Sequence, residues 1–172
     1  MKPNQIKGGI SILSGILLFI PFWLNYMQMT MMGVTGGASY IDTFKHIGDA
    51  KALTAVALVF GLLSLIAAVV LVVYGILLFL NIKGEKLGGK MSLILPIAIG
   101  AFAILAGILA IADVADLQSQ INAMLDPSDP KMTYVALGGI LFLVFGVVTI
   151  AATITAKFLV KEKQAPAPAA KK

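Results

Sequence analysis

The sequence predicts an all-α integral membrane protein, built as a four-helix bundle whose helices run alternately up and down. Two observations support this fold class. Of the 172 residues, 59% are hydrophobic and 12% are charged, whereas a soluble domain has about 45–50% apolar and about 25% charged residues. Four separate stretches are also apolar over the roughly 20 residues that a helix needs to cross a bilayer.

The four predicted spans cover about residues 8–29, 52–82, 91–112 and 133–156, and none of them holds a charged residue. The third helix is expected to continue beyond the membrane, because Val114, Leu117, Ile121 and Leu125 form one apolar face. We therefore expect residues 1–163 to form one membrane domain. Residues 164–172, rich in Pro, Ala and Lys, are expected to form a disordered tail.

The lysines predict the orientation. All 13 basic residues are lysine, and ten of them lie before the first span, between the second and third, or after the fourth. The other two connections hold three lysines and six aspartates. By the positive-inside rule both termini should be cytoplasmic, in a plasma membrane. Topology thus accounts for the net charge of +5, and no nucleic-acid partner is expected.

Small residues recur at helical spacing within the spans, where they allow two helix backbones to approach closely. In the second span the spacing alternates between three and four residues, which favours left-handed packing. The positions predicted to pack helix against helix are Gly15, Ala57, Gly61, Ser64, Ala68, Gly100, Ala103, Gly107, Gly139 and Gly146.

The first outer loop, with Tyr40, Ile41, Phe44 and Ile47, is expected to pack on the extended third helix as a small extracytoplasmic cap. We expect this cap to be the surface that recognises a partner.

Two metal sites are conceivable on the outer side. Met27, Met29 and Met31, with His46, could hold Cu(I), because thioethers are soft ligands. The alternative is that these methionines are flexible apolar filler. Asp42, His46 and Asp49 would share one helical face and could hold a divalent metal with Asp113 or Asp116. The alternative is an ordinary solvated loop.

The sequence lacks the residues that several classes of function require. The chain has no cysteine, which excludes disulfides and thiolate ligands. No predicted span carries an Asp, Glu, Lys, Arg or His side chain, whereas proton relays and ion-coupled transporters place one inside the membrane. No catalytic motif is evident. We therefore expect no enzyme activity and no cofactor.

Three short motifs carry a resemblance. They are P-F-W near the outer end of the first span, I-D-T-F in the first outer loop and Y-V-A-L-G-G-I-L at the start of the fourth span. The chain is similar in layout to small, mostly uncharacterised four-span proteins of bacteria. Claudin-like tetraspans share the topology, but their first-loop tryptophan and cysteine signature is missing here, so no function or functional residue follows from that likeness.

These observations favour a non-enzymatic accessory, scaffold or assembly subunit. It would act in the lipid bilayer on other membrane subunits or on itself, through lateral helix packing and its outer loops. Two alternatives stay open: an oligomeric channel or passive transporter, and Cu(I) handling by the outer methionines.

Overall fold

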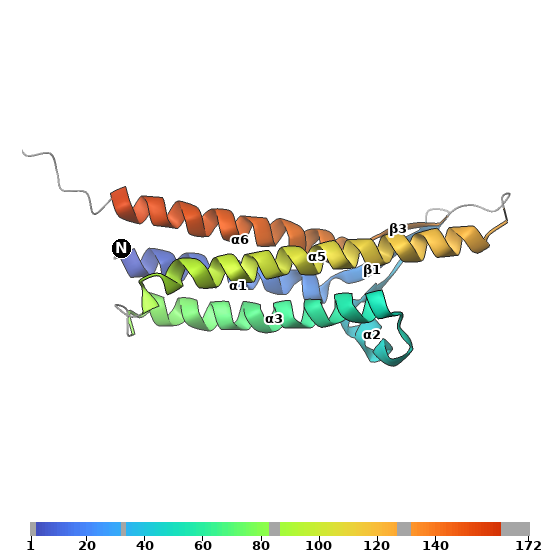
Figure 1. Cartoon of the computed structure of the whole chain (residues 1–172), viewed down its shortest axis with the longest axis horizontal. Coiled ribbons are helices and arrows are strands. Elements are labelled where there is room, and N and C mark those ends of the chain that lie inside the picture. Colours follow the sequence, from blue (N-terminus) through green and yellow to red (C-terminus); the bar gives the residue numbers. More distant parts are fainter. Residues whose placement is uncertain (1–2, 32–33, 83–86, 127–131, 163–172) are drawn as a thin grey trace, which may run out of the picture.

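Four long helices form the body of the protein: α1 (Pro3–Trp23), α3 (Ala52–Phe79), α5 (Met91–Met124) and α6 (Leu137–Glu162). The computed structural model describes residues 3–31, 34–82, 87–126 and 132–162. The helices lie side by side as an elongated bundle (Figure 1). Each is long and apolar enough to cross a membrane, which agrees with the prediction of four membrane-spanning helices.

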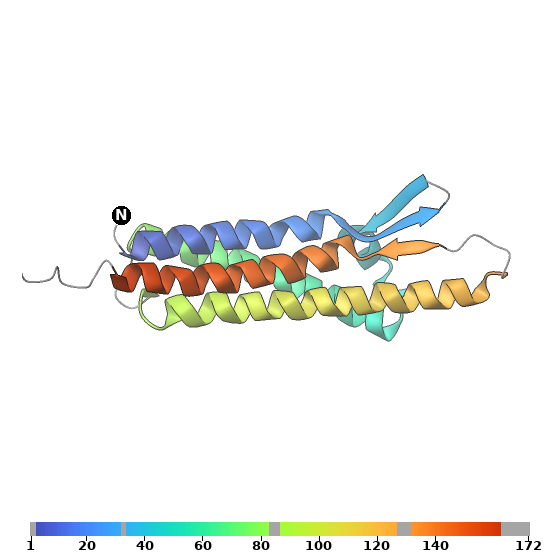
Figure 2. The same ribbon diagram turned by 90° about the horizontal axis from the view of Figure 1, so that it is seen from above.

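A three-stranded antiparallel sheet stands at one end of the bundle, so the all-α prediction is wrong there (Figure 2). Its strands are β1 (Asn25–Met31), β2 (Val34–Ser39) and β3 (Thr133–Val135), in the order β2-β1-β3. The short helices α2 (Tyr40–Lys45) and η1 (Ile47–Asp49) follow β2. We call this end of the bundle the sheet end, and the opposite end, where α1 begins, the terminal end.

The sheet explains where the predicted spans were too long. The first helix stops at Trp23 rather than near residue 29, because residues 27–31 alternate methionine and polar side chains with the period of a strand. The fourth helix begins at Leu137 rather than 133, since β3 takes the first three residues of that span. The second predicted span ends at Phe79, three residues before its predicted end, at the end of the bundle away from the sheet. The third continues to Met124, as predicted.

The helices associate as two tight antiparallel pairs, α1 with α3 and α5 with α6. Glycines bring the backbones together in both pairs. A Cβ atom on Gly8 would lie 2.6 Å from the Gly75 carbonyl oxygen, and one on Gly107 would lie 2.5 Å from that of Gly139. At these contacts the two helix backbones of each pair lie too close together for any side chain larger than the hydrogen atom of glycine.

The two pairs meet along two looser seams, α3 against α5 and α1 against α6. The strands also join the pairs, because β1 continues from α1 and pairs with β3, which leads into α6. Residues 164–172, the predicted tail, lie outside the described residues.

Candidate functional site

Tyr40, the first residue of α2, closes the bundle at the sheet end. Its side chain is 1% exposed. The ring lies between Gly61 of α3 and Gly138 of α6, where added Cβ atoms would lie 2.6 and 2.7 Å from it. The rings of Phe22, Tyr26 and Phe142 surround it, with centroids 4.8 to 5.7 Å away. An aromatic plug therefore fills the space between the two helix pairs.

This position corrects the prediction that the first outer loop packs on the extended third helix. Tyr40 packs on α1, α3 and α6 instead. Ile41 and Phe44 are 37% and 38% exposed, while Ile47 packs against the core. A helix of only six residues, α2, has one side to bury, and that side carries Tyr40.

A buried carboxyl group lies beside the plug. Asp113, on the extended part of α5, is 1% exposed. Its two oxygens accept hydrogen bonds from the Tyr26 hydroxyl, at 2.6 Å, and from the Thr54 hydroxyl, at 2.7 Å. These donors come from β1 and α3, so one carboxyl group ties the sheet and the α1–α3 pair to α5. Buried polar groups that are paired in this way hold a specific arrangement.

The surroundings of the aromatic plug also change the pKa values of Tyr26 and Tyr40. Burial, followed by the hydrogen bond to Asp113, raises the pKa of Tyr26 above its ordinary value. Burial alone raises the pKa of Tyr40. Both phenols are therefore held in the neutral form. The Tyr40 hydroxyl is buried without a hydrogen-bond partner among the described residues.

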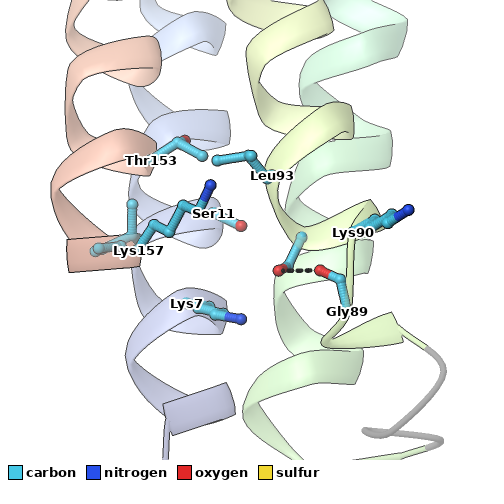
Figure 3. A pocket seen from close by; sticks show the side chains of 10 residues that line it. Lys7, Ser11, Gly89, Lys90, Leu93, Thr153 and Lys157 are labelled. Atoms are coloured by element: carbon cyan, nitrogen blue, oxygen red, sulfur yellow. Dashed lines mark hydrogen bonds between the residues drawn. The ribbon is translucent and has the colours of Figure 1, made fainter. Parts of the chain in front are cut away.

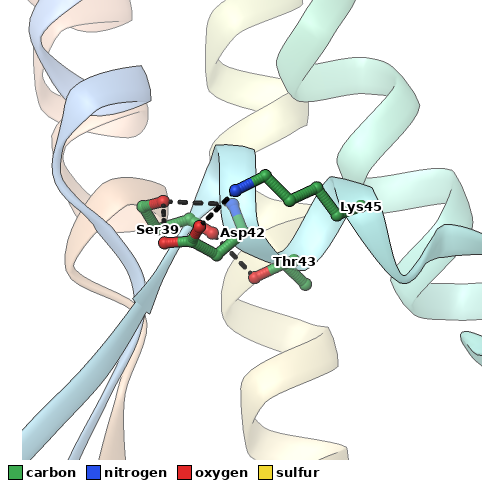
Figure 4. Close-up of polar contacts among 4 residues, drawn as sticks. All are labelled: Ser39, Asp42, Thr43 and Lys45. Carbon is green, nitrogen blue, oxygen red and sulfur yellow. Dashed lines mark hydrogen bonds and ion pairs between the residues drawn. The ribbon is translucent and has the colours of Figure 1, made fainter.

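Asp42, a residue of the second predicted metal site, takes part instead in the hydrogen bonds that cap α2 (Figure 4). The Ser39 hydroxyl accepts a bond from the Asp42 backbone N–H and donates to the Asp42 carboxylate, which also pairs with Lys45 at 3.0 Å. These bonds, that of Ser39 first, lower the pKa of Asp42. Asp113 faces Tyr26 and Thr54 instead. Within the described part of the chain, no three His, Asp or Glu side chains gather as metal ligands.

The predicted Cu(I) ligands divide between two places. Met27, Met29 and Met31 occupy alternate positions of β1, so their side chains share one face of the sheet. Tyr134 of β3 is paired with Met29, and its hydroxyl donates to the Met132 sulfur at 3.3 Å. His46 is exposed at the end of α2, outside the sheet. Binding of Cu(I) stays a prediction.

The predicted packing residues lie inside the bundle. Gly15 faces the Ala68 backbone, Gly100 and Gly107 face Gly146 and Gly139, and Gly61 faces Tyr40. The other members of the set, Ala57, Ser64 and Ala103, are no more than 1% exposed. The small residues thus serve contacts within this chain.

Sequence reasoning missed the roles of Asp113 and Tyr40. Asp113 follows an apolar run directly and was grouped with the acidic residues of an outer loop. Its signal is its spacing of three residues after Ala110, on the face of α5 that is buried in the bundle. Nothing along the chain marked the partners of either residue, because they are brought together only by the fold.

No known family model matches the chain, and no curated protein sequence is detectably similar to it.

Proposed function

We propose that the protein is a non-enzymatic membrane subunit that assembles with another membrane protein through its sheet end. The observation that carries this proposal is the open edge of β2. In the strand order β2-β1-β3, one side of β2 is paired with β1 and the other side is an edge of the sheet.

The sequence of β2 holds no charged residue and no proline. Natural sheets guard their edges with charged residues, proline or bulges, because an open edge can pair with another chain. The residues of β2 are V-T-G-G-A-S, and the first four are exposed. A partner that offers an extended segment could therefore add to the sheet as a further strand.

The polar network supports assembly rather than catalysis. Both oxygens of Asp113 are bound by hydroxyl groups of the chain itself. The group is thereby committed to holding β1, and with it the sheet, in place on the helices. A rigid platform of this kind favours binding, since little ordering of the surface is needed when a partner docks.

The test is purification of the tagged full-length protein from its native membrane in mild detergent. We expect a stoichiometric partner with the wild type, and its loss with Thr35→Lys, which places a charge on the β2 edge. Gly48→Lys is the matched control: it adds the same charge near the same end, where a new Cβ meets nothing within 4 Å. A lone monomer, or equal loss from both variants, would contradict the proposal.

Self-association can be separated from binding to another subunit. The chain has no cysteine, so Thr35→Cys introduces a unique thiol at the edge. A disulfide-linked dimer in membranes would identify a second copy as the partner. A stoichiometric complex without that dimer would identify a different subunit.

A channel is the second candidate, favoured by two hydroxyl groups. Those of Ser64 on α3 and Thr149 on α6 are buried and have no hydrogen-bond partner among the described residues. Each lies 12 residues from the sheet end of its helix, about 18 Å along it. Water could satisfy them there. Flux of ions or small solutes into liposomes by the purified protein, lowered by Ser64→Val, would support this function, and no flux would dismiss it.

A further inference from the structure

A cavity of about 250 Å³ opens at the terminal end, between α1, α6 and the start of α5 (Figure 3). It lies on a seam between the two helix pairs, at the opposite end from the Tyr40 plug. Three lysines line it: Lys7 from α1, Lys90 from the residue before α5, and Lys157 from α6. The lining includes no acidic side chain from the described part of the chain.

The lysines are placed differently around the cavity. Figure 3 shows the Lys157 side chain reaching from α6 towards Ser11, whereas the Lys90 ammonium points outward. Lys7 donates a hydrogen bond to the Gly88 carbonyl oxygen at 2.8 Å. An ammonium group has three donors, so Lys7 keeps donors for a ligand. Two cationic side chains from different helices, Lys7 and Lys157, therefore line the cavity.

Hydroxyl groups line the deeper part. Ser11, Ser92 and Thr153 are 3%, 8% and 6% exposed. Ser92 and Thr153 donate to backbone carbonyl groups of their own segments. Ser11 lies on the same wall, and its hydroxyl group is a donor for an acceptor in the cavity.

The remaining wall is apolar. Ile10 and Leu93 line the cavity, and the neighbouring Ile94 is 56% exposed on the outside of α5. Lysines with no acidic side chain beside them, together with a hydroxyl donor, match an oxygen-rich anion, and the apolar wall matches a hydrocarbon chain. Basic pockets between membrane helices are known to take anionic lipid headgroups.

We propose that this cavity binds a phosphate group, and that the apolar wall selects the phosphate of an anionic phospholipid over free phosphate. Lys7 and Lys157 contact the phosphate oxygens, Ser11 donates to one of them, and an acyl chain lies along Leu93 and Ile94. Lysine suits this role as a compact charge for a phosphate that is already held in the bilayer. The lysine count independently predicts the terminal end to face the cytoplasm, where anionic lipids gather.

The test measures the thermal stability of the delipidated full-length protein in mild detergent. Phosphatidylglycerol, phosphatidylcholine and inorganic phosphate are titrated separately, because a ligand that binds the folded state raises its melting temperature. We expect saturable stabilisation by phosphatidylglycerol alone. Stabilisation by inorganic phosphate at equal concentration would overturn the lipid selectivity, and no stabilisation by either would overturn the site.

Matched variants locate the effect. Lys7→Gln with Lys157→Gln should weaken phosphatidylglycerol binding by at least about tenfold, the scale of one lost charge-assisted hydrogen bond. Lys45→Gln with Lys51→Gln removes the same charge far from the cavity and should leave binding unchanged. If the control pair weakens binding equally, attraction to the whole protein explains it and the site is disproved.

A third variant guards against misfolding of the lysine pair. Ser11→Leu fills the cavity and keeps every charge. It should lower the affinity for phosphatidylglycerol to the level of the lysine pair. Unchanged affinity in this variant would also disprove the site.

Discussion

The two ends of the bundle solve the same packing problem differently. Both lie where the α1–α3 pair meets the α5–α6 pair. At the sheet end the space is filled by the Tyr40 ring, with the Asp113 carboxyl group bonded beside it. At the terminal end the space is an open cavity lined by lysines and hydroxyl groups. The glycine contacts hold each pair together by itself, so the seam between the pairs is free to carry a plug at one end and a site at the other.

The strongest test of this contrast removes the plug. Tyr40→Ala should lower the free energy of unfolding by about 3–5 kcal/mol, as for other buried aromatic residues, because the glycines around the ring cannot close the gap. Thermal or denaturant unfolding in detergent measures it. Thr153→Ala, which trims a side chain at the open end, should cost far less. Equal losses would mean that both ends are packed alike.

Glycine substitutions at the two ends sharpen the contrast. Gly138→Ala places a methyl group 2.7 Å from the Tyr40 ring and 3.2 Å from the Pro21 carbonyl oxygen, and should cost about 1–3 kcal/mol. Gly9→Ala, in α1 near the terminal end, meets nothing within 4 Å. It should be neutral or stabilise by up to about 1 kcal/mol, since alanine favours the helix. A larger loss from Gly9→Ala would refute this account.

Two neighbouring tyrosines should respond in opposite ways to loss of the hydroxyl group. Tyr26→Phe leaves one Asp113 oxygen without its donor, and should cost about 1.5 kcal/mol. Tyr40→Phe removes a buried hydroxyl that has no partner among the described residues, so stability should stay the same or rise. The same unfolding measurement compares them. The assigned roles would be wrong if Tyr40→Phe were the more harmful change.

Alkaline pH should destabilise the protein through the same two tyrosines. The pKa values of Tyr26 and Tyr40 are raised in the folded protein, so folding favours their neutral forms. Their contribution to stability is complete below the ordinary tyrosine pKa of about 10 and declines as the pH rises above it. The double variant Tyr26→Phe, Tyr40→Phe should lose less stability than the wild type between about pH 9 and 11. An identical loss would show that lysine deprotonation alone accounts for it.

The four helices could be predicted because the signal is local: each is a long apolar run. The continuation of α5 to Met124 followed from an apolar face on the same helix. The sheet could not be predicted in the same way, because Gln28 pairs with Val135 more than 100 residues away. Met27, Met29 and Met31 are as apolar as a helix end, and hydropathy alone hid their alternation with polar residues.

The candidate site depended even more on distant contacts. Tyr26, Thr54 and Asp113 belong to three elements, and each is unremarkable among its neighbours in the sequence. The lysines of the cavity were visible, but they were used only to predict orientation. Their placement around one cavity depends on the start of α5 lying beside α1 and α6, which no spacing within one segment specifies.

The pairing of β1 with β3 has a mechanical consequence. It links the α1–α3 pair to the α5–α6 pair at the sheet end, and the chain that runs from α3 into α5 links the same two pairs again at the terminal end. Relative movement of the pairs is therefore restrained at both ends, and the bond from Lys7 to the Gly88 carbonyl oxygen adds to the restraint at the terminal end. The lysine cavity lies beside this second link, so the chain itself holds the cavity walls before any ligand enters.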